Sequence, residues 1–441
     1  MEYERFRQEL FRAALNEGCS AAETFKQEGE SFSVSILEQE IDSYSVSRAF
    51  GVGLRVQLGG KNGYAYTEVL EEPETLVQKA MDNARSIENT DDHPMQTACD
   101  YSDITPLQDP LSSLSEEEKI GLAMEMERLV LAHGEPVLKC AGSVVETGRQ
   151  TVSIHNTLGL AAEETRGYSM LLAEPVVKRG DEVRNSYAFR CADTDIRGLT
   201  AEAVEKAVGK LGAEAVAPGK YRILLQNEAA ITLLQAFSPM FSADMAQKGL
   251  SLLAGKEGQV IASSIVSVAD NPFEAGMPRA FDAEGTPSEK TALVECGILK
   301  SLLHNLKTAK KAGCKSTSNG GRGSAASPVD VSPSNLYILP GECPAASLME
   351  QLGNGLVITS LAGAHAGVNR VSGDFSLLAS GYLVENGSIA RPVDQITVAG
   401  SFLKLMSGVI GVGDDLRFGF PGSSRFGSPS LLVESLMVAG K

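Results

Sequence analysis

The sequence predicts an α+β protein, with a mixed α/β amino-terminal region followed by a β-rich carboxy-terminal domain. In the first half, segments with apolar residues at helical spacing alternate with segments in which apolar and polar residues alternate one by one, as in half-buried strands. In the second half, short apolar runs are separated by glycines and other turn residues. We expect three parts: an α/β region at 1–90, a second α/β region at 110–217, and the β-rich domain at 219–441.

The first region is predicted to begin with a helix whose apolar stripe includes Phe6 and Leu10 and which ends near Gly18. Four strands are then expected at residues 31–38, 41–49, 52–58 and 63–67. The turns between them are rich in glycine, so the strands should form an antiparallel meander. A second helix is predicted at 73–87, and the polar segment 90–110 should be a linker.

The second region should open with a helix capped by Ser115, because Glu118 completes a capping box. Strands are expected from residue 137 to about residue 190, with breaks at Gly148, Gly159 and Gly180. A helix at 200–211 and the sequence Ala-Pro-Gly at 217–219 indicate a domain boundary.

The carboxy-terminal domain should begin with a buried strand at 221–225 and an apolar helix that starts near Asn227. Asn386-Gly387 predicts a tight hairpin turn, because both residues tolerate positive backbone φ angles. A short packing helix is expected at 401–407. Further strands are expected at 291–296, 298–303, 336–339, 356–360, 375–384 and 431–438.

Composition excludes several classes of protein. The net charge is -17, whereas a nucleic-acid surface requires clustered lysine and arginine. The seven cysteines are scattered and form no C-x-x-C pair, so a disulfide framework is not expected. The amino terminus does not resemble a signal peptide, and the longest uncharged run, 351–369, is interrupted by glycines and polar residues. These observations predict a cytoplasmic protein with reduced thiols and no membrane span.

The helix that follows the strand at 221–225 is a suitable place for a metal site, because it would hold ligands rigidly between apolar flanks. A zinc hydrolase would carry two histidines and a glutamate there. This helix instead carries Gln235, Ala236 and Met240, so we expect a core helix with no metal-binding or catalytic role. Ser401-x-x-Lys404 has the spacing of a Ser-Lys pair, but it lies in the predicted packing helix.

A glycine- and serine-rich loop at 316–327 is the strongest candidate for binding. Its backbone amides are not obstructed by large side chains, and Arg322 could meet a carboxylate or a peptide terminus. A flexible connection between strands explains the same composition, and both interpretations stay open. The candidate peptide-binding residues are Ser316, Asn319, Gly320, Gly321 and Arg322.

Several separate blocks, in the same order along the chain, resemble the TldD/PmbA family. Members of this family were named modulators of DNA gyrase and are grouped with peptidases. The blocks are Phe-Asp-Ala-Glu-Gly-Thr-Pro at 281–287, Gly-Ile-Leu at 297–299, Lys-Ser-Thr at 315–317, Ser-Gly-Asp-Phe-Ser at 372–376, Gly-Tyr-Leu-Val-Glu-Asn-Gly at 381–387, Pro-Val at 392–393, Ile-Thr-Val-Ala-Gly at 396–400 and Gly-Val-Gly-Leu-Arg at 51–55.

The resemblance implies a branch within the family. TldD-type members carry His-Glu-x-x-x-His on the helix that corresponds here to the one after the strand at 221–225. They also carry a further cysteine ligand near the end of the chain. Here Gln235, Ala236 and Met240 occupy the motif positions, Ser424 lies in the cysteine region, and no cysteine follows Cys343. The chain thus resembles the PmbA branch, also called TldE-type, which lacks the metal motif. No cofactor is expected in this chain, and zinc is expected only in a TldD-type partner.

The first functional hypothesis is therefore a noncatalytic partner subunit of a metallopeptidase that processes or degrades short unfolded peptides. A second is a metallopeptidase with an atypical site built from distant residues such as His304 or His365. A third is a homodimeric peptide-binding protein. The expected partners are a TldD-type subunit, in a heterodimer or larger assembly, or a second copy of this chain, together with a peptide substrate. No nucleic acid and no membrane are expected.

Overall fold

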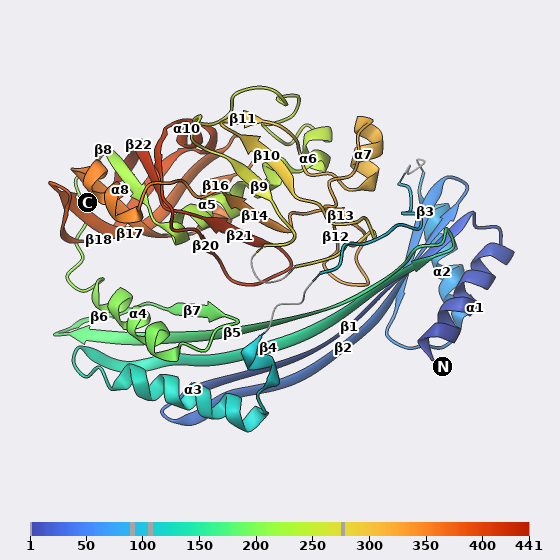
Figure 1. Ribbon diagram of the computed structural model, residues 1–441, viewed down its shortest axis with the longest axis horizontal. Helices are drawn as coiled ribbons and strands as arrows, with labels where there is room; N and C mark the ends of the chain where they lie inside the picture. The colour runs from blue at the N-terminus through green and yellow to red at the C-terminus, as the bar shows by residue number, and fades with distance from the viewer. Residues whose placement is uncertain (1, 89–92, 105–108, 275–277, 441) are drawn as a thin grey trace.

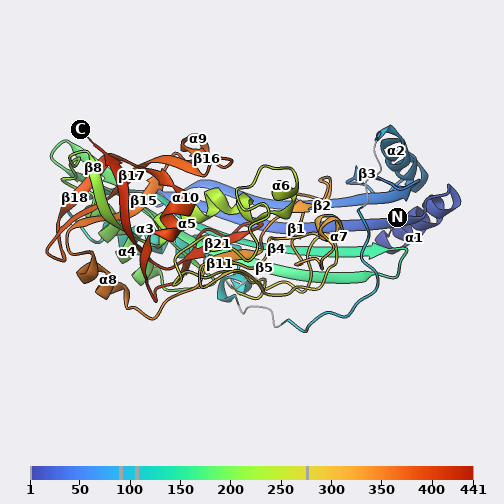
Figure 2. The same cartoon turned by 90° about the horizontal axis from the view of Figure 1, so that it is seen from above.

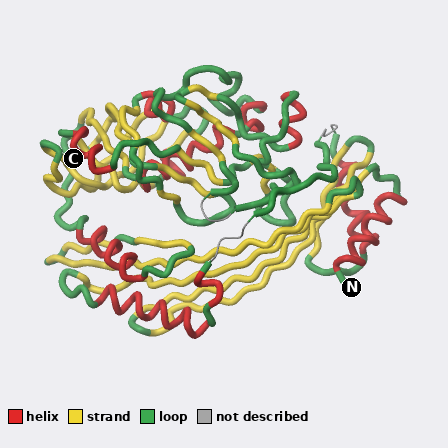
Figure 3. Tube along the Cα trace, in the orientation of Figure 1, coloured by secondary structure: helices red, strands yellow, loops and turns green. Residues whose placement is uncertain are grey.

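The computed structural model describes residues 2–88, 93–104, 109–274 and 278–440 of the 441-residue chain. A long, curved sheet from the first half of the chain lies beneath a carboxy-terminal domain (Figure 1). Figure 3 shows long strands in the lower layer and shorter strands, separated by many loops, in the upper layer. The expected α+β class, with its β-rich carboxy-terminal domain, is confirmed.

The lower sheet is antiparallel, with the strand order β3-β2-β1-β4-β5-β6, and β7 pairs with β5. Seen from above, its strands run under the carboxy-terminal domain and beyond it toward the amino terminus (Figure 2). Its strands are β1 (Ala21–Leu37), β2 (Glu40–Leu58), β3 (Lys61–Thr67), β4 (Val137–Asn156), β5 (Ala161–Arg179), β6 (Glu182–Asn185) and β7 (Ala188–Cys191).

Two pairs of helices cover opposite ends of this sheet (Figure 1). The helices α1 (Tyr3–Asn16) and α2 (Pro73–Ser86) bury Phe6, Leu10 and Met81 at one end. At the other end, α3 (Glu116–Leu131) and α4 (Ile196–Val208) share a core with β1, β4 and β5, and η1 (Pro110–Ser113) precedes α3. The predicted capping box of Ser115 and Glu118 is present.

The strands of the lower sheet are longer than expected, and two glycines explain the difference. The separate strands expected at 41–49 and 52–58 form the single strand β2, and the expected break at Gly148 is absent because β4 runs through it. A Cβ atom at Gly148 would lie 2.2 Å from the ring of Tyr168, its partner in β5. A Cβ atom at Gly51 would lie 2.7 Å from Tyr66. These glycines make room for a cross-strand aromatic ring and do not end the strand.

The carboxy-terminal domain contains two larger sheets around one hydrophobic core. In one, the order is β15-β8-β22-β18-β17-β16, and an additional β15–β17 pairing joins its strands into a ring; β19 pairs with β22. The other has the order β11-β10-β9-β14-β21-β20, and β12 and β13 form a separate pair. The predicted hairpin turn joins β17 to β18, with positive φ at Asn386 (52°) and Gly387 (75°).

The bounds of the remaining strands are β8 (Gly219–Leu225), β9 (Val268–Asp270), β10 (Thr291–Glu295), β11 (Ile298–Leu299), β12 (Gly320–Gly321), β13 (Asp330–Val331), β14 (Asn335–Ile338), β15 (Gly355–Ala362), β16 (Val368–Asn369), β17 (Asp374–Glu385), β18 (Ser388–Ser401), β19 (Val409–Val412), β20 (Arg417–Phe418), β21 (Arg425–Ser428) and β22 (Leu431–Ala439). The helices of this domain are α5 (Asn227–Phe237), η2 (Ser238–Phe241), α6 (Ala243–Gln247), α7 (Leu306–Ala312), α8 (Ala345–Leu352), α9 (Ala364–Gly367) and α10 (Phe402–Ser407).

The expected domain limits stay predictions. The first limit, at residue 90, and part of the expected linker at 90–110 lie outside the described residues. None of the helices in the described parts of the chain is long and apolar enough to cross a membrane.

Candidate functional site

A cavity of about 900 Å³ lies between the two layers of the molecule. The lower layer contributes β5, β7 and α4, and the carboxy-terminal domain contributes α5 and the segment from β20 to β21. Its volume is in the range of small-molecule sites. The lining residues are Asp109, Gly167–Ser169, Tyr187, Phe189–Ala192, Glu202, Lys206, Asn227, Glu228, Ile231, Thr232, Gln235, Arg417–Pro421 and Ser424–Phe426.

One wall of the cavity is aromatic. Phe189 stacks on Phe420, with 4.3 Å between ring centroids, and Tyr187 packs against the same ring at 5.5 Å. Tyr187 and Phe189 belong to the lower layer and Phe420 to the carboxy-terminal domain, so the rings bridge the two layers. Phe420 nevertheless remains 43% exposed and Tyr187 38% exposed.

A second wall is charged and centres on Glu202 of α4. Arg190 Nη2 donates to Glu202 Oε2 at 2.6 Å, while Lys206 Nζ and Arg417 Nη1 lie 3.1 and 2.9 Å from Oε1. Burial alone would raise the pKa of Glu202, but the hydrogen bond from Arg190 and the charges of Lys206 and Arg417 outweigh it and lower the pKa to about 2. Glu202 is therefore a carboxylate at neutral pH and holds three cations at the cavity.

The four positions expected to be a degenerate metal site divide into two groups. Gln235 and Ser424 both line the cavity, although they are far apart in sequence. Ala236 and Met240 are instead buried in the core of the carboxy-terminal domain. Ser424 Oγ donates to the carbonyl of Pro333 at 2.6 Å.

This donor set does not fit zinc. A catalytic zinc site takes about three histidine, carboxylate or thiolate ligands, whereas these positions offer a neutral amide, a hydroxyl, a methyl group and a thioether. Within residues 2–88, 93–104, 109–274 and 278–440, no group of three or more His, Cys, Asp or Glu side chains is arranged to hold a metal ion.

The glycine- and serine-rich loop does not line this cavity, and several of its polar groups are bonded within the protein. The amide of Gly320 donates to Asp282 Oδ2 at 2.7 Å, and Ser316 Oγ donates to the carbonyl of His304. Asn319 is fully buried and donates to Asp270. Arg322 Nη2 donates to Oε1 of Glu23 in β1 at 3.3 Å, so this arginine has a carboxylate partner within the chain. Gly321 pairs with Asp330 between β12 and β13. Peptide binding by this loop stays a prediction.

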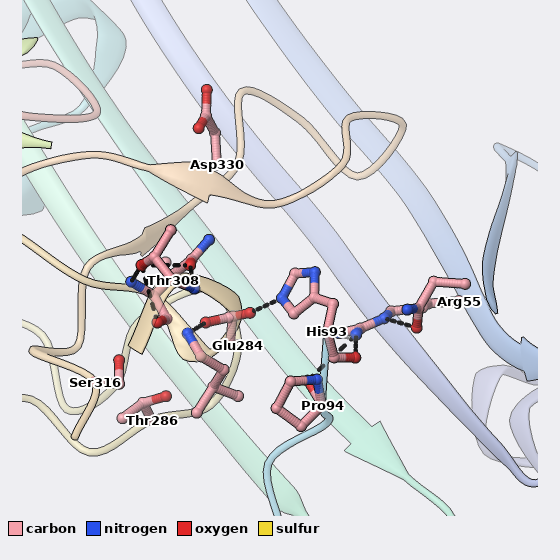
Figure 4. A network of polar contacts seen from close by, with 12 residues as sticks. Arg55, His93, Pro94, Glu284, Thr286, Thr308, Ser316 and Asp330 are labelled. Atoms are coloured by element: carbon pink, nitrogen blue, oxygen red, sulfur yellow. Dashed lines mark hydrogen bonds and ion pairs between the residues drawn. The ribbon is translucent and has the colours of Figure 1, made fainter. Parts of the chain in front are cut away.

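The loop instead contributes to a buried polar network where the two layers meet, which we call the joint. It consists of Glu23, Arg55, His93, Asp282, Glu284 and Arg322. Figure 4 shows His93 between Glu284 and Arg55. His93 Nε2 contacts Glu284 Oε1, and the carbonyl of His93 accepts from Arg55 Nη2. The amide of Leu306 donates to Glu284 Oε2 at 2.7 Å.

The carboxyl groups of the joint have perturbed pKa values. Burial raises the pKa of Asp282, and the neighbouring Glu284 raises it further. Burial also raises the pKa of Glu284, against the lowering effects of the Leu306 amide, Arg55 and Arg322. No chemistry was expected of these residues from the sequence. The signal was present in the block at 281–287, which places two acids beside a glycine.

The histidines proposed for an atypical peptidase site do not meet at the cavity. His304 is buried, and its carbonyl accepts bonds from Ser316 and Thr317. His365 lies on α9 and lines a separate, open cleft of about 690 Å³ with Arg370 and Asp374. Neither residue lines the cavity beside α5.

Comparison with known proteins identifies the family. Residues 218–440 match the model of the PmbA/TldA metallopeptidase C-terminal domain, 22–84 match domain 1, and 109–211 match the central domain. A solved structure of a proposed modulator of a DNA gyrase from Thermotoga maritima has a TM-score of 0.91 and 32% identity, and the match covers 99% of this chain and 100% of that chain.

Two relatives from Haemophilus influenzae are also similar. A metalloprotease TldD homologue is 26% identical over 90% of this chain and 88% of its own length. A metalloprotease PmbA homologue is 23% identical over 96% of this chain and 92% of its own length. The family models together with the Thermotoga structure show that this chain belongs to the PmbA/TldD family of metallopeptidase-related proteins.

Proposed function

We propose that this chain is the noncatalytic subunit of a metallopeptidase, and that a TldD-type partner supplies the zinc and cleaves short unfolded peptides. The observation that carries the proposal is the cavity beside α5. It is lined by Gln235 and Ser424, two positions at which the resemblance implies zinc ligands in TldD-type members, and neither side chain is a zinc ligand of the usual kind. A large cavity that lacks a set of metal ligands is suited to holding a peptide that another subunit cleaves.

The edge of the lower sheet supports a role as a subunit. β3 pairs only with residues 52–58 of β2, and no described strand covers the outer edge of residues 40–51. Ile41, Tyr44 and Val46 on this stretch are all exposed. A long uncovered edge with apolar side chains is a template for strand pairing. We propose that the partner subunit, or a second copy when the partner is absent, pairs with this edge.

We place the assembly in the cytoplasm. All seven cysteines are free thiols in the structure, including the buried Cys19 and Cys140. Free thiols are typical of a reducing compartment.

Coexpression of this chain with a TldD-type subunit from the same organism tests the proposal. The expected result is copurification, and chelator-sensitive cleavage of an unfolded peptide by the complex that exceeds the sum of the separate chains. Val46→Lys should weaken the complex, because it places a charge on the proposed pairing edge. Val183→Lys is the matched control, since Val183 is an exposed valine on β6 at the opposite edge of the sheet.

Absence of a complex at micromolar concentrations would contradict the proposal. Equal weakening by both valine variants would contradict the assignment of the edge. Peptide binding by a stable homodimer, without a TldD-type partner, would favour the homodimeric peptide-binding protein.

A further inference from the structure

We infer that the cavity beside α5 binds a peptide segment in which an aromatic side chain lies next to a carboxylate. The inference rests on the proposed function and specifies its substrate class. The aromatic wall and the charged wall of the same cavity carry it, because together they supply complementary surfaces for both groups.

The aromatic wall leaves ring surface exposed. Phe189 stacks on Phe420 across the two layers and Tyr187 packs against the same ring, yet Phe420 and Tyr187 remain partly exposed. Exposed stacked rings beside a cavity bind a further ring or a large apolar side chain favourably, because offset stacking adds to the burial of apolar area. Ile231 of α5 lines the same cavity and adds an aliphatic surface.

The charged wall favours an anion. Four cations line the cavity, namely Arg190, Lys206, Arg417 and Arg425, against three carboxylates, namely Asp109, Glu202 and Glu228. The chain as a whole has a net charge of -17, so a cationic excess at this place is a local feature and not a general property of the surface.

Arg417 is the residue best placed to bind the carboxylate. Its hydrogen bond to Glu202 uses Nη1, and its side chain is 58% exposed. A guanidinium has five N–H donors, so Arg417 keeps donors for a second carboxylate. That carboxylate can be the carboxy terminus of a peptide or an acidic side chain, and both present the same group to the cavity.

The absence of tryptophan from this chain makes a direct assay possible. A Trp-containing peptide can be excited selectively, so its fluorescence and anisotropy report binding to the full-length protein. Three probes separate the sources of the carboxylate: Ala-Ala-Ala-Trp with a free carboxy terminus, the same peptide amidated, and the amidated peptide Ala-Ala-Asp-Trp. Unlabelled Ala-Ala-Ala-Ala with a free carboxy terminus, used as competitor, tests the need for the ring.

We expect the peptide with a free terminus, the Asp-containing amide, or both to bind at least about tenfold more tightly than the neutral amide, as for a charge-assisted hydrogen bond. Arg417→Gln should remove this difference, and Phe420→Ala should weaken all three probes. Arg128→Gln, a change of an exposed arginine on α3, is the matched control and should change nothing. The all-alanine competitor should displace the probes poorly.

Equal affinity for acidic and neutral probes, or an unchanged difference in Arg417→Gln, would overturn the inference. So would the absence of binding by all three probes. These results would leave the proposed function standing if the complex with a TldD-type subunit still formed and cleaved peptide. Loss of that complex with peptide binding intact would instead overturn the proposed function.

Discussion

The cavity and the joint both concentrate charged side chains between the two layers, but they bury those charges to very different degrees. At the joint, the side chains of Glu23 and Arg322 are 1% and 3% exposed, and their ion pair is 3.3 Å long. At the cavity, Glu202 holds three cations that are themselves partly exposed. The comparison indicates that the joint holds the layers together, whereas the cavity keeps charge accessible to a ligand.

The physical basis of this difference is the cost of removing charge from water. A buried ion pair is strongly destabilising when one partner is removed, because the other charge is left without compensation. A partly exposed pair contributes little, because water screens both partners. Mutations at the joint should therefore mainly change stability, whereas mutations at the cavity should mainly change ligand binding.

The largest effect is expected for Glu23→Ala. This change leaves Arg322 buried without its ion-pair partner, and removes the carboxylate that lies 3.9 Å from Arg55 Nη1. We expect the free energy of unfolding to fall by about 3–5 kcal/mol. Urea denaturation followed by circular dichroism measures it. A loss comparable to that of an exposed ion pair would show that the joint does not stabilise the contact between the layers.

A pH-dependent effect is expected at Glu284. Its raised pKa means that the folded protein binds a proton more tightly than the unfolded chain does. The unfolding free energy should therefore fall as the pH rises from about 4.3, the ordinary glutamate pKa, toward neutral. Glu284→Gln cannot ionise and should show a flatter dependence, although Asp282, His93, Arg55 and Arg322 still surround the site.

Denaturation of wild type and Glu284→Gln at intervals between pH 4.5 and pH 8 tests this. The unfolding free energy of Glu284→Gln minus that of wild type should increase with pH, by at least about 1 kcal/mol over this range. A parallel pair of curves would contradict the raised pKa.

The smallest effect on stability is expected for Glu202→Gln. Its cations lie in partly exposed positions, where water screens the ion pairs, so the unfolding free energy at neutral pH should fall by only about 1–2 kcal/mol, less than for Glu23→Ala. The same change frees Arg190, Lys206 and Arg417 from a carboxylate, so the acidic tryptophan peptide should bind several-fold more tightly. Weaker binding of that peptide would show that Glu202 contacts the ligand itself or orders the cations around it.

Local features of this fold were predictable from the sequence because their signals are contiguous. The capping box at Ser115, the Asn386-Gly387 turn and the helix from Asn227 all follow from neighbouring residues. The continuous strands β2 and β4 were not predicted, because glycine normally interrupts strands and its role here depends on a ring in the next strand.

The candidate sites were harder to predict, because the residues that meet there come from distant segments. Glu23, His93, Glu284 and Arg322 meet only in the folded chain. Arg322 pairs with Glu23 of β1, and sequence composition does not show that its carboxylate partner lies within the chain. Likewise, Gln235 and Ser424 were identified through the family resemblance, while their common cavity also depends on aromatic residues from the lower layer.

The central claim is that this chain works as a noncatalytic subunit, and metal content measured together with activity tests it most directly. The purified chain should be dialysed extensively, analysed for zinc by mass spectrometry, and assayed on an unfolded peptide with and without a TldD-type subunit. We predict well under one zinc per chain, no cleavage by the chain alone, and chelator-sensitive cleavage by the mixture above that of the partner alone. One tightly bound zinc per chain, with chelator-sensitive peptidase activity of the pure protein, would contradict the account.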